Sequence, residues 1–175
     1  VGNGDTAVGI DLAASTDAWG PTYAGDVSDE SSVRSAFDAI RADHGNPTVL
    51  VNCAGMAGRG GVVEEPLDIW RRILDVNLTS VFLCTREVVP GMRQAGGGKI
   101  LNIASVNGRF GGSALSGPAY ATSKGGMLTL TRFLAREHAT DNIQVNAVAP
   151  GPHDTPMWQA LDADRRTRIL GMLPG

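Results

Sequence analysis

Short apolar segments alternate with amphipathic segments along most of the chain. Apolar residues dominate five stretches that are expected to be buried strands: 7–12, 22–27, 48–53, 99–105 and 143–149. Apolar residues recur at helical spacing in four other stretches: 28–45, 67–93, 120–140 and 158–170. Nearly continuous apolar strands that alternate with helices are typical of a parallel sheet with helices on both faces. The pattern therefore predicts a single α/β domain over residues 1–175.

Local signals indicate where several elements begin and end. Ser28 has the character of a helix N-cap, and Gly45 ends the same helix. Pro90 predicts a break or a kink near the end of the 67–93 helix. Residues 13–21 are too few for a helical crossover, which usually takes at least about 10–12 residues. We therefore expect a loop or a single turn there.

Polar or turn-forming residues stand where the predicted strands end. These residues are Asp11, Asp26, Asn52, Ser105 and Pro150. The carboxyl ends of parallel strands meet at one edge of an open sheet, and ligands bind beyond that edge. The sequence therefore predicts one ligand site built from these strand ends.

Tyr120 and Lys124 lie four residues apart at the start of the 120–140 segment. On a helix, that spacing puts both side chains on one face. A free phenol has a pKa of about 10, and a nearby ammonium favours its phenolate form. The pair therefore has the composition of an acid/base unit. Because many helices carry such a pair at their surface, the spacing alone leaves an exposed surface pair as the alternative.

Three strand-end motifs are suited to hold a nucleotide. The Asp11 carboxylate is suited to accept hydrogen bonds from a ribose diol and to repel a 2′-phosphate, and a cap or turn is the alternative. Asp26 and Val27 are suited to line an adenine, or else to begin a helix. The segment Asn52-Cys-Ala-Gly55 has small residues where a backbone must approach a ligand closely.

Ser105 ends a strand and leads into a Gly-rich loop that reaches Tyr120. It has no Gly-x-Ser-x-Gly surroundings, and the three histidines show no triad arrangement, which disfavours a serine hydrolase. Its hydroxyl is suited instead to donate to a substrate oxygen. Asn77 falls within a helical segment, where asparagine is unfavourable. It is expected either to open the backbone for a water molecule or to face solvent.

Composition narrows the class of function. The net charge is −3 without long charged runs, so a nucleic-acid partner is not expected. Cys53 and Cys84 lie in apolar segments without metal-ligand spacing. We therefore expect buried free thiols, no metal and a reducing, cytoplasmic compartment. No apolar run reaches the roughly 18 residues of a membrane span, and no signal peptide is recognisable.

Taken together, these motifs resemble those of the short-chain dehydrogenase/reductase family. The matching positions, in chain order, are Asp11, Asp26-Val27, Asn52 to Gly55, Asn77 to Ser80, Ile103 to Ser105, Tyr120-x-x-x-Lys124, Pro150-Gly151 and Thr155 to Met157. The resemblance covers nearly the whole chain and implies a doubly wound, Rossmann-like sheet. It also implies an oxidoreductase that transfers a hydride between NAD(H) and a secondary alcohol or ketone.

The resemblance implies a role for each catalytic candidate. Tyr120 would be the proton donor to a ketone or the acceptor from an alcohol, and Ser105 would hold the same oxygen. Lys124 would favour the phenolate and bind the nicotinamide ribose, while Asn77 would position a water molecule in the proton relay. Asp11 would select NAD over NADP. The other implied cofactor contacts are Asp26, Val27, Asn52, Ala54 and Gly55 on the adenosine side, and Pro150, Gly151 and Thr155 at the nicotinamide end.

Substrate and assembly are also expectations from the resemblance. The loop 108–117 and the helix after Met157 would shape an apolar alcohol or ketone pocket. Its apolar residues are Phe110, Leu115, Met157, Trp158 and Leu161. Helices 67–93 and 120–140 would form the interface of a homotetramer or dimer.

The chain departs from the family pattern at both ends. Nothing before Asp11 supplies the family's first strand and Gly-rich phosphate loop, and its last strand is also missing. We therefore expect an incomplete sequence, a slot in mid-sheet beside the strand that ends at Asp11, and weak NAD binding by these 175 residues. Two alternatives stay open: an NADP-dependent 3-oxoacyl-thioester reductase, and a non-catalytic fragment of such an enzyme.

Overall fold

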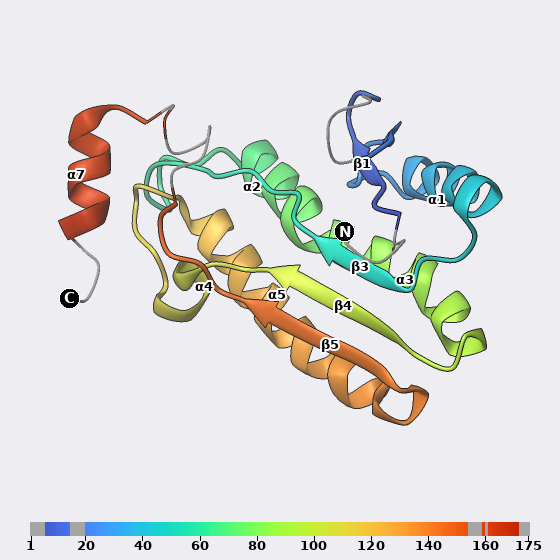
Figure 1. Ribbon diagram of the computed structural model, residues 1–175. Coiled ribbons are helices and arrows are strands. Elements are labelled where there is room, and N and C mark those ends of the chain that lie inside the picture. Colours follow the sequence, from blue (N-terminus) through green and yellow to red (C-terminus); the bar gives the residue numbers. More distant parts are fainter. Residues whose placement is uncertain (1–5, 15–19, 154–158, 160, 172–175) are drawn as a thin grey trace.

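The computed structural model describes residues 6–14, 20–153, 159 and 161–171 (Figure 1). Its strands are all parallel, as the sequence predicts. They are β1 (Gly9–Asp11), β2 (Thr22–Ala24), β3 (Val49–Asn52), β4 (Gly98–Ile103) and β5 (Ile143–Val148). The helical segments are α1 (Glu30–His44), α2 (Leu67–Leu74), the π-helix η1 (Asp75–Thr79), α3 (Ser80–Gln94), α4 (Val106–Phe110), α5 (Pro118–Glu137), the 3-10 helix η2 (Ala139–Asp141) and α7 (Ala163–Gly171).

The strands form two sheets instead of one continuous sheet. β1 pairs with β2, and β3, β4 and β5 pair in that order. Within the described residues, no strand pairs with β1 on its other side or with β3 on its other side. The α/β fold class is confirmed, and the break between β1 and β3 lies where the sequence predicts a slot.

The main core lies between the β3–β5 sheet and the helices packed on one of its faces. Side chains alternate along a strand, so Ile100 and Val145 point to the same face and are both buried. They join one apolar cluster with residues from α1, α3 and α5, among them Val33, Val88 and Leu134. Figure 1 shows α3 and α5 behind the sheet. The core therefore fixes α5 against β4 and β5.

The opposite face of the same sheet is open in the described part of the chain. Val49 and Val51 on β3 are more than half exposed, and Val148 on β5 is 44% exposed. Along β5 this face also carries Gln144 and Asn146. The alternation of buried and exposed residues along each strand thus assigns the helices α1, α3 and α5 to one side.

Several predicted boundaries are corrected by the structure. The N-cap of α1 is Asp29 and not Ser28, because the Asp29 carboxylate accepts a hydrogen bond from the Ser32 amide at 2.8 Å. Pro90 does not break its helix, since α3 continues to Gln94. The Gly-rich segment after Ser105 contains the short helix α4.

Two other expectations lie partly outside the described residues. Residues 13–21 connect β1 and β2, and residues 15–19 of this link are not described. The last helix, expected over 158–170, is described as α7 from Ala163 to Gly171. Within the described residues, no helix combines the length and apolar character that crossing a bilayer requires.

Candidate active site

The first turns of α5 bring Tyr120 and Lys124 together. Gly117 is the N-cap and Pro118 is the first helical residue, so the helix starts just before Tyr120. The Lys124 ammonium lies 5.9 Å from the centroid of the Tyr120 ring. Lys124 is only 4% exposed, which rules out the exposed surface pair as a description of this residue.

Lys124 is held by the end of the neighbouring strand. Its Nζ donates a hydrogen bond to the Ile103 carbonyl on β4 at 2.7 Å. Burial lowers the pKa of Lys124 to about 8, an effect that the nearby Cys53 partly opposes. A lysine in this state changes charge within the range in which most enzymes work.

Ser105 lies two residues beyond that carbonyl, at the N-cap of α4. Its Oγ accepts a hydrogen bond from the Asn107 amide at 3.2 Å, and the residue is 7% exposed. The close approach of α4 to α5 depends on Gly108. A Cβ atom at Gly108 would lie 2.5 Å from the carbonyl carbon of Lys124. The strand end, α4 and α5 therefore meet at one place, around Ser105 and Lys124.

Asn77 is fully buried in η1, between α2 and α3. The widened turn is marked by a hydrogen bond from the Ser80 amide to the Asp75 carbonyl, five residues back. Asn77 does not face solvent. Its Oδ1 accepts from the Met56 amide at 2.8 Å, and its Nδ2 donates to the Met56 carbonyl at 2.9 Å.

The second amide hydrogen of Asn77 forms a hydrogen bond with α5, the helix that carries Tyr120. Nδ2 also donates to the Ser123 hydroxyl at 3.0 Å, and that hydroxyl donates to the Tyr120 carbonyl at 2.8 Å. Asn77 therefore links three segments: the loop after β3, η1 and the first turn of α5. Gly55 lies against this group, since a Cβ atom there would be 3.5 Å from the Asn77 Oδ1 and 3.6 Å from the Lys124 Nζ.

The Asn52 side chain is directed toward the neighbouring strand β4 and not toward the edge where the strands end. The residue is 9% exposed, and its Nδ2 donates to the Asn102 Oδ1 at 2.8 Å. Asn102 in turn donates to the Thr131 hydroxyl on α5 at 2.9 Å. The Asn52 side chain thus joins β3 to β4 and, through Asn102, to α5. The residues that follow it, Cys53 to Gly55, are exposed at the strand end.

The Asp26 carboxylate is held by three donors. Ser28 donates both its amide and its hydroxyl, at 2.9 Å and 2.6 Å, and Arg72 of α2 donates at 3.1 Å. The hydrogen bonds from Ser28 are the main reason that the pKa of Asp26 is lowered, and Arg72 adds to the effect. Val27 is partly buried and packs against the main core cluster.

The remaining predicted cofactor residues lie in exposed or loop positions. Asp11 is exposed at the end of β1, where its Oδ1 accepts from the Leu12 amide at 2.7 Å. The Pro150 carbonyl accepts from the Val106 amide at 3.1 Å, which ties the loop after β5 to α4. Gly151 follows in that loop, and Thr155 lies outside the described residues.

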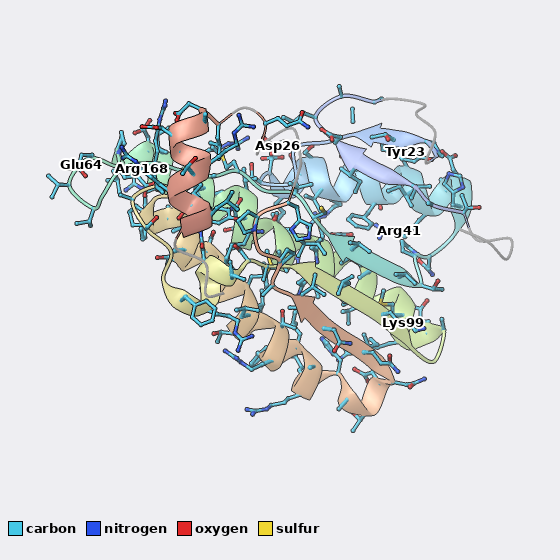
Figure 2. All side chains as sticks on the ribbon, turned by 60° about the vertical axis from the view of Figure 1, so that its left-hand side comes forward. Tyr23, Asp26, Arg41, Glu64, Lys99 and Arg168 are labelled. Carbon is cyan, nitrogen blue, oxygen red and sulfur yellow. The ribbon has the colours of Figure 1, made fainter. Side chains whose placement is uncertain are left out.

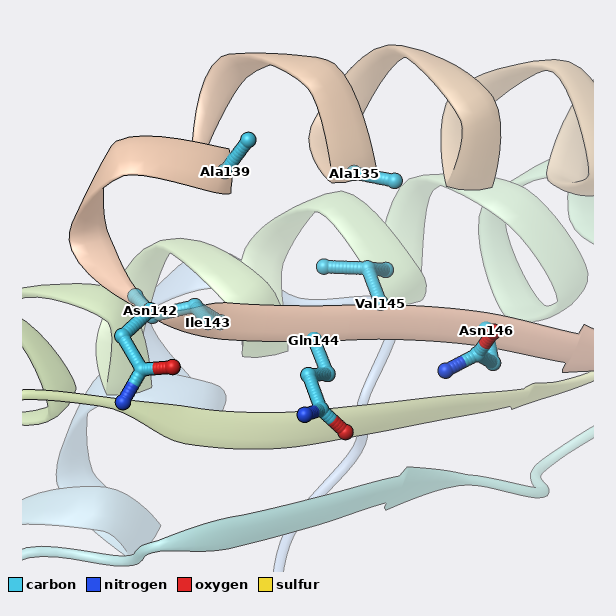
Figure 3. Close-up of a pocket in the computed structure, with 7 residues that line it drawn as sticks. All are labelled: Ala135, Ala139, Asn142, Ile143, Gln144, Val145 and Asn146. Atoms are coloured by element: carbon cyan, nitrogen blue, oxygen red, sulfur yellow. The ribbon is translucent and has the colours of Figure 1, made fainter.

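The expected apolar pocket residues are only partly brought together. Phe110 is 72% exposed, whereas Leu115 and Leu161 are half-buried. Met157 and Trp158 lie outside the described residues. A pocket elsewhere, between α5 and β5, contains none of the candidate residues (Figure 3). Its lining residues are Ala135, Ala139, Asn142, Ile143, Gln144, Val145 and Asn146.

Sequence reasoning was wrong about one thiol and missed several contacts. Cys53 is exposed, like Val49 and Val51 at the alternate positions of β3, while Cys84 is buried and burial raises its pKa to about 11. Arg72 and Ser123 were not singled out, because their partners lie 46 residues away in the sequence. In the described residues, no group of three or more metal-ligating side chains of the His, Cys, Asp and Glu types occurs.

Comparison with known proteins identifies the family. A family model described as short chain dehydrogenase matches residues 12–166. A cis-4-hydroxycyclohexanecarboxylate dehydrogenase of Sinomonas cyclohexanicum is 40% identical over 85% of this chain and 59% of its own length. A 3-oxoacyl-[acyl-carrier-protein] reductase of Salmonella typhimurium is 37% identical over 85% of this chain and 60% of its own length.

A solved structure agrees with these sequence matches. The crystal structure of a putative short-chain dehydrogenase/reductase from Burkholderia xenovorans has a TM-score of 0.77 and 38% sequence identity. The match covers 84% of this chain and 58% of that chain. The chain thus spans about three fifths of the length of these relatives. The family model, the relatives and the solved structure agree that the chain belongs to the short-chain dehydrogenase family.

Proposed function

We propose that the protein transfers a hydride between NAD(H) and a secondary alcohol or ketone, with Tyr120 as the proton donor or acceptor. The observation that carries this proposal is the burial of the Lys124 ammonium 5.9 Å from the Tyr120 ring. A phenol held beside a buried ammonium has the composition of a proton-transfer unit. Ser105, at the adjoining strand end, is buried and close to the carbonyl that holds Lys124.

Each residue then has a defined task. In alcohol oxidation, the Tyr120 oxygen takes the hydroxyl proton, while the Ser105 hydroxyl donates a hydrogen bond to the same substrate oxygen. In ketone reduction, the proton moves the other way. Lys124 lies beside the Tyr120 ring and offers its ammonium to a ribose hydroxyl. The nicotinamide, when bound, supplies or accepts the hydride, so the protein contributes mainly orientation and proton transfer.

The side chains at the sheet edge fit a dinucleotide. Cys53, Ala54 and Gly55 are small and exposed beside Lys124, which leaves space for close approach. Asp11 is exposed at the end of β1 with one oxygen engaged by its neighbouring amide. A carboxylate in this position favours a free ribose diol over a 2′-phosphate, which supports NAD over NADP. Asp26, Val27, Asn52, Pro150, Gly151 and Thr155 remain proposed contacts.

Asn77 has a different part in this proposal. Both amide hydrogens of its side chain are engaged by Met56 and Ser123, so the side chain itself positions protein groups. We propose that any water of the proton relay is held by backbone groups of the widened η1 turn.

An apolar substrate and subunit contacts through α3 and α5 complete the proposal. Leu115 and Leu161 support the apolar pocket, and both are half-buried near the loop and helix expected to shape it. Phe82 on α3 and Phe133 on α5 are 50% and 60% exposed, which supports a homodimer or homotetramer.

A 3-oxoacyl thioester reductase that uses NADP is the second candidate. It is favoured by the 37% identity to a relative named 3-oxoacyl-[acyl-carrier-protein] reductase. Rates with NADH and NADPH, measured with simple ketones and with 3-oxoacyl thioesters, separate the two candidates. Faster turnover of thioesters with NADPH would support this second candidate.

Replacement of Tyr120 tests the proposed chemistry. We expect Tyr120→Phe to lower kcat by at least about 100-fold, because a positioned acid or base contributes roughly 10²–10⁴-fold. Far-UV circular dichroism and the unfolding midpoint should stay unchanged, since the hydroxyl has no hydrogen-bond partner among the described residues. The assay uses the longest natural chain that contains these residues. Wild-type turnover in Tyr120→Phe would refute the proposal.

A further inference from the structure

The N-terminus of α5 is capped by a side chain from a distant loop. Gly117 at the N-cap has no side chain to accept a hydrogen bond, and Pro118 has no amide hydrogen. The next amide belongs to Ala119, which is fully buried. The Glu65 Oε2 accepts a hydrogen bond from this amide at 2.9 Å, across 54 residues of sequence.

The surrounding glycines make room for the Glu65 carboxylate. A Cβ atom at Gly117 would lie 2.6 Å from the Glu65 Oε1, and a Cβ atom at Gly58 would lie closer still. Glu65 Oε1 is itself buried and has no hydrogen-bond partner in the described part of the chain. The carboxylate is therefore enclosed between the loop after β3, which contains Gly58, the loop before α5, which contains Gly117, and the start of α5.

Both loops are fixed to one another around this carboxylate. The Gly58 amide donates to the Ser116 carbonyl at 3.0 Å. Arg165 of α7 donates to the carbonyls of Gly58 and Leu115, so α7 closes the same region. The backbone of Glu65 is held by a hydrogen bond from its amide to the Gly61 carbonyl at 3.1 Å. Glu65 thus has little freedom to move away from α5.

We propose that Glu65 is a positioning residue for Tyr120. Its carboxylate caps α5 one residue before the tyrosine and holds the first turn of the helix where Ser105 and Lys124 meet it. A carboxylate at a helix N-terminus both satisfies a free amide and interacts favourably with the helix dipole. Glu65 touches neither substrate nor cofactor in this role, which rests on the proposed function of Tyr120.

The variants Glu65→Gln and Glu65→Asp show whether the cap requires the length of the Glu65 side chain or its negative charge. Glutamine keeps an oxygen at the same distance from Ala119 without the charge, whereas aspartate keeps the charge but is one methylene too short. We expect Glu65→Gln to retain kcat within about threefold. We expect Glu65→Asp and Glu65→Ala to lower kcat by at least about tenfold, since a misplacement of about 1 Å can cost a hundredfold. The KM for the dinucleotide should change by less than about twofold.

Glu64→Ala is the matched control. Glu64 is the adjacent residue, is exposed, and accepts a hydrogen bond from the Gly61 amide at 2.7 Å, not from α5 (Figure 2). We expect Glu64→Ala to leave kcat and KM unchanged. A tenfold loss of kcat in this variant, or wild-type kcat in a folded Glu65→Ala, would overturn the proposal.

Amide hydrogen exchange gives a readout that does not depend on activity. In Glu65→Asp, peptides that cover residues 118–124 should exchange about tenfold faster, while peptides from α3 should be unchanged. If the wild-type protein shows no dehydrogenase activity but this local change occurs, the cap stands and the proposed function fails. Unchanged exchange at 118–124 in Glu65→Asp shows instead that Glu65 does not hold the helix.

Discussion

Replacing Asn77 tests whether its side chain connects η1, the loop after β3 and α5. We choose Asn77→Leu, because leucine has the same number and branching of side-chain heavy atoms but no hydrogen-bonding group. The substitution removes the partners of the Met56 amide and carbonyl and one partner of the Ser123 hydroxyl. The Ser123 hydroxyl keeps its bond to the Tyr120 carbonyl, so the main losses fall on Met56.

The size of the effect follows from those losses. A buried backbone group left without a partner costs about 1–3 kcal/mol, and two such groups are affected. Met56 is half-buried, so water satisfies part of the demand. We therefore expect Asn77→Leu to lower the free energy of unfolding by about 2–4 kcal/mol. For a chain of this length, each kcal/mol corresponds to roughly 2–4 °C in Tm.

Urea unfolding followed by circular dichroism measures this change. The slope m should equal that of the wild type, which shows that the compactness of the two states is unchanged. The control is Asn146→Leu on β5, the same substitution at an exposed position, where we expect a change within about 0.5 kcal/mol. A loss below 1 kcal/mol in Asn77→Leu, with an unchanged m, would refute the idea that the Asn77 side chain connects η1, the loop after β3 and α5.

Two further predictions concern Lys124 and its contact with α4. The folded-state pKa of Lys124, about 8, lies below its unfolded value of 10.5, so between these values the unfolded chain binds more protons. We expect the stability of the wild type, relative to Lys124→Met, to rise from pH 8 to pH 10.5; a flat difference in urea titrations excludes the shift. A Cβ atom at Gly108 would meet the Lys124 backbone at 2.5 Å, so Gly108→Ala should cost about 1–3 kcal/mol. Gly171→Ala, where nothing lies within 4 Å, is its control, and equal stability of the two variants would contradict the crowding argument.

Much of the architecture follows from local sequence patterns. The parallel strands are predicted because each is a short, nearly continuous apolar run separated from the next by a helical pattern. Tyr120 and Lys124 are predicted to share a face because the period of an α-helix requires it. Ser105 is predicted at the site because the carboxyl ends of parallel strands meet at one edge. These inferences need only the spacing of residues along the chain.

Tertiary structure alone decides which side chains are buried and what they contact. The sequence leaves Lys124 as either an exposed or a buried residue, and in the folded protein its ammonium is buried against the end of β4. Cys53 lies in an apolar segment yet is exposed, as are Val49 and Val51 of the same segment, because that face of the sheet is open in the described part of the chain. Glu65 binds the Ala119 amide across 54 residues, a contact that no local pattern encodes. The physical reason is that helical and strand periods repeat within a few residues, whereas caps, burial and pKa shifts depend on segments that only folding brings together.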